Sequence, residues 1–388
     1  MTTLAAILAG AAALGAAGAA RSAEGAAQPA EGAAQEQCGP WPHWNRYVER
    51  FISPDGRVLD HSAADRTTSE GQSYALFFAL VANDRPLFER VLGWTGRNLA
   101  QGDLQAHLPS WNWGKRRDQS WGTLDANPAS DADLWIAYSL LEAARLWNEP
   151  GFEKTARAVL ANVAGHEVAT LAGLGPMLLP GPAGFTSGRG TRLNPSYQPP
   201  QLLRRFASAQ VPGPWKEIQA SSARMLRDTA GRGAVADWIL YRPQRGFSDD
   251  PVHGAKGSYD AIRSYLWVGM LPAGDPAQLP AVPLLRALDQ TGRIPEQIDV
   301  RSLQGRGEAP VGFAGALLPL ARARGDTKAV DALEARLSNA WRGDLYGDPP
   351  AYYDQNLILF GKGFADGRFR FAADGRLVPA WEASCGKR

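Results

Sequence analysis

The sequence predicts an all-α fold in which two kinds of helix alternate along the chain. Apolar residues recur at a helical spacing in most segments, and the alternation typical of strands is scarce. Segments 70–82 and 131–147 are apolar nearly all round, so they should be buried on most sides. Segments 152–165 and 328–340 have one polar face. This alternation favours an inner and an outer ring of helices, an α/α toroid.

The predicted helices follow each other with few breaks, and no repeat of fixed length is visible, which disfavours a regular solenoid. They are 43–51, 70–82, 86–99, 131–147, 152–165, 199–208, 214–229, 258–271, 280–292, 311–323, 328–340 and 351–363. Long connections rich in Pro, Gly and Trp separate some of them, at 100–130, 166–198, 230–257 and 293–310. We expect these connections to form a cleft at one end of the ring, because long loops in compact domains are often functional. Short strands are expected around 237–248 and 368–379.

Composition excludes several classes of protein. The 388 residues carry 41 Lys and Arg against 39 Asp and Glu, a net charge of +2, so charge predicts neither a nucleic-acid partner nor a polybasic membrane surface. With 45% hydrophobic residues the chain is too apolar for disorder.

The N-terminus has the features of an export signal. Residues 4–17 form an apolar run of signal-peptide length, and Gly18-Ala19-Ala20 is an acceptable cleavage site, although no basic residue precedes the run. We expect a signal peptide at 1–20, a flexible leader at 21–37 and one folded domain at 38–388. No later stretch is long and apolar enough to span a membrane. The predicted location is the periplasm or the outside of the cell.

Cys38 and Cys385 are the two cysteines, one at each edge of the folded region. In an exported protein this placement predicts a disulfide that ties the ends together, and two free thiols are the alternative. The five histidines are scattered without ligand spacing, so no metal site is predicted.

Acidic residues open three of the helices that should be buried. Glu70 follows Ser69, a suitable N-cap, and a carboxylate in the first turn suits the helix dipole. A helix start is therefore one interpretation of Glu70. The other is catalytic, because a carboxyl group held among apolar and aromatic groups keeps its proton and can act as a general acid.

The other acidic helix starts are Asp131 with Asp133, and Asp260. Capping by Ser130 or Asp131 and an ion pair from Asp260 to Arg263 are the structural alternatives. The D-x-D pattern also occurs in glycosyltransferases, but it normally ends a strand of an α/β fold, which this sequence does not predict.

If the inner helices run parallel, all these carboxylates meet at one end of the ring. A pair of acids on a cleft floor is what glycoside hydrolysis requires. Aromatic residues in the adjoining loops are candidates for stacking on sugar rings, and others among them should be packing: Trp111, Trp113, Trp121, Tyr197, Tyr259 and Trp267.

At these residues the chain resembles glycoside hydrolase family 8. The motifs are T-T-S-E-G-Q-S-Y-A at 67–75, A-S-D-A-D-L-W-I-A-Y-S-L-L-E-A at 129–143 and S-Y-D-A-I-R at 258–263. Further matches include L-P-S-W-N-W-G-K-R at 108–116 and L-N-P-S-Y-Q-P-P at 193–200. The resemblance implies an (α/α)6 barrel and hydrolysis with inversion of the anomeric centre. It is strongest to family members that work in the periplasm beside bacterial cellulose synthase.

The resemblance also implies roles for single residues. Glu70 matches the general acid and Asp260 the base that activates water. Asp131, the first Asp of the A-S-D-x-D signature, matches the residue that holds the distorted sugar, and Asp133 is expected to be structural. Tyr197 and Arg263 match residues that flank the base, and Trp111 and Trp113 resemble residues that stack on glucose. Together with Tyr259 they are the predicted substrate-binding residues.

The function implied is an endo-β-1,4-glucanase, a cellulase, that needs no metal or cofactor. Its partners would be a β-1,4-glucan chain and, during cellulose secretion, the cellulose synthase complex. Alternatives are another β-1,4-glycanase acting on chitosan, xylan or mixed-linkage glucan, a polysaccharide lyase, or a glucan-binding accessory protein that does not cut.

Overall fold

The computed structural model describes residues 39–272 and 274–383. The predicted signal peptide, the predicted leader and both cysteines lie outside the described residues. Within the described part of the chain, no helix has the length and apolar character needed to cross a membrane.

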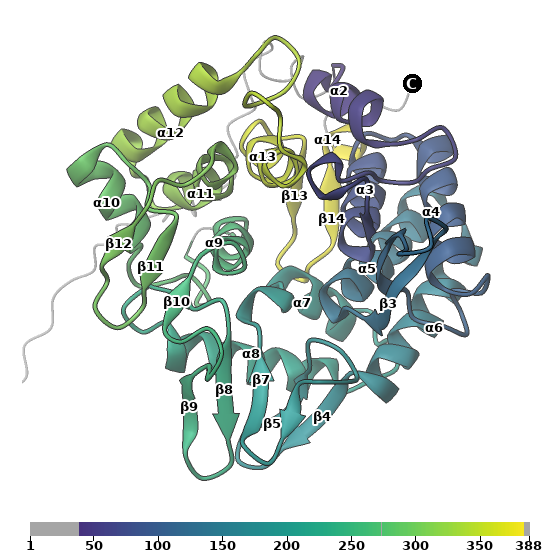
Figure 1. Cartoon of the computed structure of the whole chain (residues 1–388), viewed down its shortest axis with the longest axis horizontal. Helices are drawn as coiled ribbons and strands as arrows, with labels where there is room; N and C mark the ends of the chain where they lie inside the picture. The colour runs from purple at the N-terminus through teal and green to yellow at the C-terminus, as the bar shows by residue number, and fades with distance from the viewer. Residues whose placement is uncertain (1–38, 273, 384–388) are drawn as a thin grey trace, which may run out of the picture.

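The described chain is mostly helical, as predicted. Figure 1 shows helices grouped around a common centre: α3 (Ser69–Val81), α5 (Ser130–Trp147), α7 (Pro200–Ser208), α9 (Ala261–Gly269), α11 (Val311–Ala323) and α13 (Tyr352–Ala365). Outside them lie α2 (Pro42–Phe51), α4 (Arg85–Leu99), α6 (Pro150–His166), α8 (Trp215–Thr229), α10 (Pro283–Thr291) and α12 (Thr327–Ala340). The short helix α14 (Ala380–Ala383) follows them in the chain. Every predicted helical segment overlaps one of the longer helices.

Burial separates the two groups as the hydrophobic pattern predicts. In α3 every residue except Glu70 is buried, and the first four turns of α5 are buried on all sides. In α12, by contrast, the buried residues are Ala329, Leu333 and Leu337, which lie on one face. The central helices therefore form the core, and the outer helices cover it with one apolar face each.

The ring of Phe360 on α13 joins the central helices to each other. It lies 4.5–5.2 Å, centroid to centroid, from five aromatic rings that come from α3, α5 and α9: Tyr74, Phe77, Phe78, Trp135 and Trp267. Several of these contacts are edge-on or tilted, which is the arrangement that aromatic quadrupoles favour. Phe360 itself is fully buried.

Short antiparallel strands occupy the connections. They pair as β1 (Thr67–Thr68) with β2 (Ser110–Lys115) and β3 (Trp121–Pro128), and as β4 (Val168–Leu171) with β5 (Gly175–Leu178). A larger sheet has the order β6 (Thr186–Ser187), β7 (Gly190–Leu193), β8 (Ile239–Arg242) and β9 (Gly246–Asp249). The remaining sheets are β10 (Lys256–Gly257) with β11 (Gln297–Asp299) and β12 (Gly305–Arg306), and β13 (Phe369–Phe371) with β14 (Leu377–Pro379).

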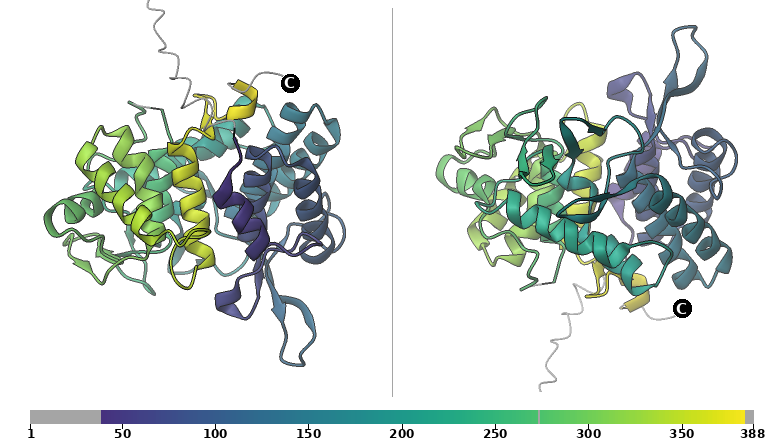
Figure 2. Two further views of the ribbon diagram at one scale, coloured as in Figure 1. Left: turned by 90° about the horizontal axis from the view of Figure 1, so that it is seen from above. Right: turned by 90° about the horizontal axis from the view of Figure 1, so that it is seen from below.

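The strands expected around 237–248 and 368–379 are present as β8–β9 and β13–β14. The other strands were not predicted, because runs of two to eight residues in Gly-rich connections give little alternation to detect. The hairpin of β2 and β3 projects away from the body of the molecule (Figure 2).

Local hydrogen bonds correct three predicted helix starts. Thr68, not Ser69, caps α3, since its hydroxyl accepts from the backbone N–H of Gly71 at 3.1 Å. The N-cap of α5 is Ala129, with no side-chain cap. Helix α9 begins at Ala261, three residues later than predicted. The carboxylate of Asp237 accepts from the N–H groups of Ser258 and Ala261, which holds the preceding residues as a loop.

Replacing Phe360 by Ala should test how far the central helices depend on this ring. The change removes a fully buried ring and leaves a cavity, so we expect a loss of about 3–5 kcal/mol in the free energy of unfolding measured in urea. Replacing the exposed Leu124 by Ala, as a control, should change it by less than about 0.5 kcal/mol. A loss below about 1 kcal/mol for Phe360→Ala would contradict a central role for this ring.

Candidate active site

The guanidinium group of Arg263 on α9 brings together the three predicted catalytic carboxylates. One terminal nitrogen pairs with Glu70 and lies 3.6 Å from Asp131 Oδ2, and the other donates to Asp260 Oδ1 at 2.8 Å. The side chain of Arg263 is only 4% exposed. Because each carboxylate belongs to the start of a different central helix, these starts lie at the same end of the molecule.

The three carboxylates differ in their access to solvent. The side chains of Glu70 and Asp260 are 26% and 32% exposed, whereas that of Asp131 is 5% exposed. Asp131 Oδ1 also accepts from the N–H of Ala132 at 2.9 Å, which fixes the carboxylate at the first turn of α5. A ligand at this end can therefore reach Glu70 and Asp260 more readily than Asp131.

Burial is the largest cause of the pKa shifts of Asp131, Asp260 and Arg263. It raises the pKa of Asp131 to about 8, and the charges of Asp260 and Asp133 add to the rise. Burial also raises the pKa of Asp260 to about 6, with repulsion from Asp237 as the next cause. For the same reason burial lowers the pKa of Arg263 below its ordinary value. A single buried guanidinium thus has three carboxylates as neighbours, and burial favours the protonated form of Asp131.

Asp260 has a second donor that the sequence did not reveal. The indole N–H of Trp238 donates to Asp260 Oδ2 at 3.0 Å, while Arg263 donates to Oδ1. The Trp238 ring is stacked on Phe185 at 5.8 Å, and the guanidinium of Arg192 lies 4.9 Å from its centroid. Asn194 and then Trp238 favour the ionised form of Asp260 and lower its pKa against the effect of burial.

Glu70 and Arg263 have further partners close by. The hydroxyl of Tyr74, one helical turn after Glu70, donates to Glu70 Oε1 at 2.9 Å. Arg263 donates to the hydroxyl of Ser196 at 3.0 Å, and the ring of Tyr197 lies 5.5 Å from the guanidinium. Tyr197, predicted to flank the base, is therefore part of this cluster.

Other predicted binding residues lie further out. Tyr259, directly before Asp260, is 44% exposed, and its hydroxyl donates to Glu296 at 2.9 Å. Trp111 and Trp113 lie on β2 and are half-buried. The Trp113 ring is already stacked on Trp121 at 5.5 Å and lies 4.4 Å from the Arg57 guanidinium. These three residues thus do not contact the carboxylate cluster through any of their described side-chain contacts, and stacking on sugar stays a prediction for them.

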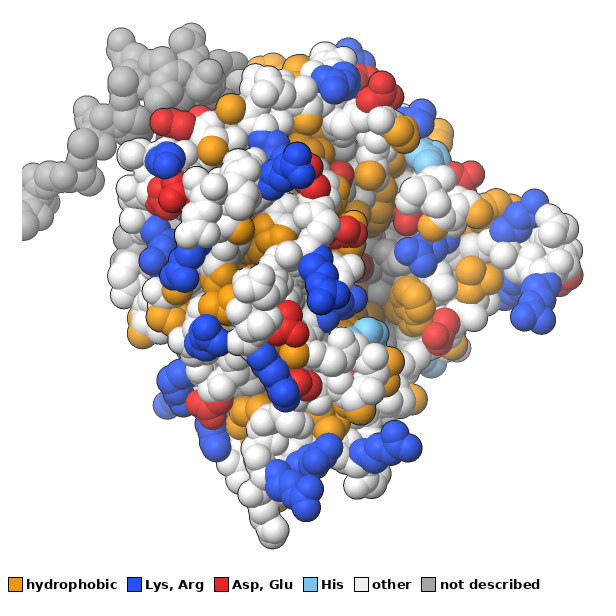
Figure 3. All heavy atoms as spheres, turned by 60° about the vertical axis from the view of Figure 1, so that its left-hand side comes forward, with side chains coloured by type: hydrophobic (Ala, Val, Ile, Leu, Met, Phe, Trp, Pro, Cys, Tyr) orange, Lys and Arg blue, Asp and Glu red, His pale blue; other side chains and the backbone are white. Residues whose placement is uncertain are grey.

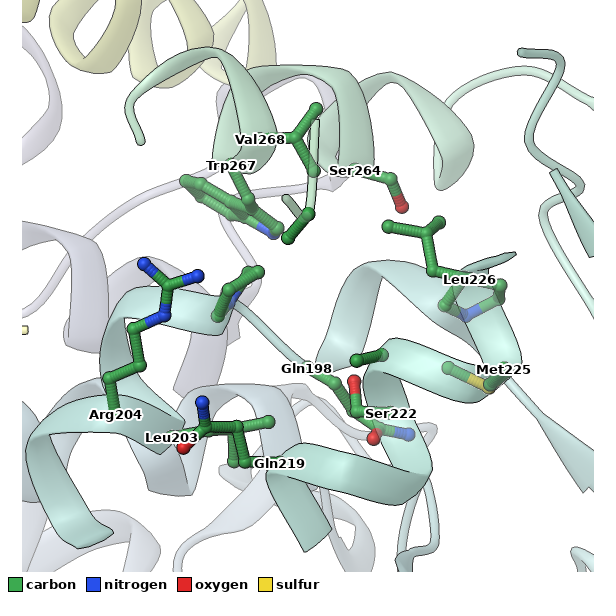
Figure 4. A pocket seen from close by; sticks show the side chains of 14 residues that line it. Gln198, Leu203, Arg204, Gln219, Ser222, Met225, Leu226, Ser264, Trp267 and Val268 are labelled. Atoms are coloured by element: carbon green, nitrogen blue, oxygen red, sulfur yellow. The ribbon is translucent and has the colours of Figure 1, made fainter. Parts of the chain in front are cut away.

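One face of the molecule is hollowed. Figure 3 shows a hollow on one face, with acidic and hydrophobic side chains along it. A separate small cavity of about 50 Å³ lies between α7, α8 and α9, lined by residues that include Leu203, Met225 and Trp267 (Figure 4). None of the three carboxylates lines that cavity, so it is distinct from the carboxylate cluster. Over the described ranges no group of three or more His, Cys, Asp or Glu side chains is arranged to hold a metal ion.

Comparison with known proteins agrees with this geometry. The model of the family described as glycosyl hydrolases family 8 matches residues 30–367. The chain belongs to this family. It is therefore a glycoside hydrolase, and the three motifs of the sequence resemblance lie at the helix starts that meet at Arg263.

Individual relatives cover nearly the whole chain. An endoglucanase from Xanthomonas axonopodis pv. citri is 50% identical over 352 residues, which cover 89% of this chain and 90% of the relative. An endoglucanase from Escherichia coli K12 is 42% identical over 350 residues, with 89% and 92% covered. The crystal structure of an endo-1,4-D-glucanase from Vibrio fischeri superposes with a TM-score of 0.80 at 40% identity, covering 88% of this chain and 99% of that one.

Sequence reasoning missed four residues of the site. Tyr74 could have been found, because it is four residues after Glu70 on a predicted helix and so faces the same way. Ser196, Asp237 and Trp238 lie in long connections, where no periodicity says which side chains meet a distant helix.

Removing the cation should make the stability of the protein depend on pH. In Arg263→Met the three carboxyl groups remain together without their cation, so the folded state must bind extra protons. The pKa values of Asp131 and Asp260 then lie further above the unfolded values, and stability is lost as the pH rises. We expect a loss of about 3–5 kcal/mol near pH 7, larger at pH 8 and smaller at pH 5, by urea unfolding.

The matched control is Arg145→Met. Arg145 pairs with the buried Glu142, which keeps a second arginine, Arg205, and the N–H of Leu377 as partners. In Arg145→Met the loss of unfolding free energy should be smaller than in Arg263→Met, and it should be similar at pH 5 and pH 8. An equal loss at pH 5 and pH 8 for Arg263→Met would contradict the charge argument.

Proposed function

We propose that this glycoside hydrolase is an endo-β-1,4-glucanase that cuts cellulose or soluble β-1,4-glucan. The observation that carries the proposal is the group of Glu70, Asp131 and Asp260 around Arg263, with Glu70 and Asp260 the more exposed members. The names of the relatives at 40–50% identity support the same substrate class.

In the proposed reaction, Glu70 donates a proton to the glycosidic oxygen and Asp260 removes one from the attacking water. Glu70 and Asp260 pair with the two different terminal nitrogens of one guanidinium, so both carboxyl groups lie beside Arg263. Inversion of the anomeric centre requires a separation of roughly 6.5–9.5 Å between the two carboxyl groups, with room for water. We propose inversion from the family to which the chain belongs.

Arg263 would help to divide the two roles. Glu70 must hold a proton before the reaction, so it must exchange its pairing with Arg263 for a proton when the sugar binds. Asp260 must be ionised, and Arg263 and Trp238 both donate to it. Burial favours the protonated form of Asp131, which can donate a hydrogen bond to a sugar hydroxyl; this supports its proposed role in holding the distorted ring.

The fold that we propose is the (α/α)6 barrel of the family, with the cleft at the end where the three helices start. The arrangement of central and outer helices in Figure 1 supports this proposal. In such a cleft Tyr197, Tyr259, Trp111 and Trp113 would contact successive sugar rings.

We further propose export of the chain and a role in cellulose synthesis and secretion, in the periplasm or outside the cell. The signal-like N-terminus and the family resemblance support both. A Cys38–Cys385 disulfide belongs to the same proposal. Gly39, Pro40 and Trp381, which are close in sequence to the two cysteines, line one hollow, and Arg368 donates to the carbonyl oxygen atoms of both Gly39 and Pro40.

Glu70→Gln and Asp260→Asn test the reaction directly. Each variant keeps the shape of the side chain and removes its acid–base chemistry, so we expect turnover to fall at least about 10²-fold with folding retained. The measurement is reducing-sugar release from carboxymethyl cellulose, followed by NMR of the anomer released first. Full activity in either folded variant would disprove the assignment of that residue. No release by the unaltered chain from this substrate would contradict the proposed function.

Trp238→Phe tests whether the indole controls the base. Asp260 must be ionised, so activity should fall as the pH drops through about 6. Without the indole donor the pKa of Asp260 rises, and we expect the acid limb of kcat/KM to move up by about one pH unit. Trp147→Phe serves as the control, because the indole of Trp147 donates to Asn83. An unmoved acid limb in Trp238→Phe would show that the indole does not govern the base.

A further inference from the structure

Two carboxyl groups that the proposed reaction does not use face each other behind Asp131. They belong to Asp133, one turn into α5, and Glu167, directly after α6, and both residues are 0% exposed. The two groups lie within hydrogen-bonding distance of each other. None of their four oxygen atoms accepts a hydrogen bond from a donor in the part of the chain that the structure describes.

Such a pair cannot hold two charges. A buried carboxylate without a donor or a cation loses its hydration and gains nothing in return, and a second negative charge in contact adds repulsion. One proton between the two groups removes one charge and provides the missing donor, in a short O–H···O⁻ hydrogen bond. The same arrangement underlies the carboxylate dyads in which two acids share a proton.

We propose that Asp133 and Glu167 share one proton, and that this bond is a positioning device which holds the start of α5, with Asp131, against the chain that follows α6. The part of this proposal that concerns activity rests on the proposed function. The part that concerns the shared proton does not.

Backbone hydrogen bonds show that Asp133 and Glu167 lie where the start of α5, the end of α6 and the chain after β5 meet. The carbonyl oxygen of Glu167 accepts from the N–H of Leu179 at 2.7 Å, and the N–H of Ser130 donates to the carbonyl oxygen of Pro180 at 3.1 Å. The first bond joins the end of α6 to the chain after β5, and the second joins the same chain to the start of α5. The Asp133–Glu167 bond links α5 to the end of α6 directly. Without this hydrogen bond, the first turn of α5, which carries Asp131, loses its side-chain contact with the end of α6.

The electrostatic surroundings of Asp133 and Glu167 favour the form of the pair that holds a proton. Burial raises the pKa of both groups well above ordinary values, and repulsion from Asp133 adds to the rise for Glu167. Other titratable neighbours act little on the pair. His166, which precedes Glu167, has its side chain exposed, and Arg263 is directed to Asp131 on the reacting side.

Thermal unfolding across a pH series tests the shared proton. The folded pair keeps a proton that the unfolded chain releases near its ordinary carboxyl pKa, so the pair costs stability as the pH rises. In Glu167→Gln and Asp133→Asn an amide donates to the remaining carboxylate, and no proton is needed. We expect the Tm of each variant, relative to the unaltered chain, to rise by at least about 2 °C between pH 5 and pH 8.

The matched control is Glu142→Gln, on the same helix and also 0% exposed. Glu142 is paired with Arg145 and Arg205, so its loss leaves cations without a partner and should lower the Tm throughout the series. Two results would overturn the proposal. One is a Tm difference between Glu167→Gln and the unaltered chain that does not change with pH. The other is a fall in the Tm of Glu167→Gln throughout the series, as expected for Glu142→Gln.

Kinetics on carboxymethyl cellulose test the positioning role. Asp133→Ala removes the bond, and we expect kcat to fall at least about 10-fold with KM within about 2-fold. Asp133→Asn should restore kcat to within about 3-fold of the unaltered chain. Equal losses in the two variants, or no loss in Asp133→Ala, would overturn the positioning role. If the unaltered chain releases no sugar, the proposed function fails, and the Tm series still decides whether the proton is shared.

Discussion

The contact between one buried guanidinium and three carboxylates is the constraint on which the site depends. Arg263 is nearly inaccessible to solvent, and its partners Glu70, Asp131 and Asp260 come from separate parts of the chain. A single cation cannot neutralise three anions, so protons must complete the charge balance. Burial, with the charges of Asp260 and Asp133, raises the pKa of Asp131, and this rise connects folding of this end of the molecule to its chemistry.

The rest of the architecture keeps that contact in place. Aromatic side chains join α3, α5, α9 and α13 through Phe360, in the interior behind the first turns of these helices. Dense packing of this kind resists small displacements, because interiors are close-packed and few voids are available. The cost of gathering buried acids at the helix starts is thus met by apolar and aromatic burial deeper in the molecule.

Groups outside the cluster adjust it from several sides. Trp238 contacts Asp260 from the connection before β8, and Tyr74 contacts Glu70 from α3 itself. The Asp133–Glu167 pair lies on the far side of Asp131. Each support comes from a different element, so each carboxylate has its own environment. Acid–base catalysis needs such a difference, since one group must hold a proton while another is ionised.

The amino-acid pattern by itself determined the helices and the acids that open them. Every predicted helix is present, because apolar spacing reports which faces are buried and burial is a local property of each segment. The motifs around Glu70, Asp131 and Asp260 likewise identified the family before any geometry was known. Tertiary structure decided the remainder. Thr68 rather than Ser69 caps α3, and Asp237 delays the start of α9. Trp238, Ser196 and Glu167 reach their partners from loops or helix ends far away in sequence. Their contacts depend on how the chain closes in three dimensions, and no spacing along the sequence encodes that.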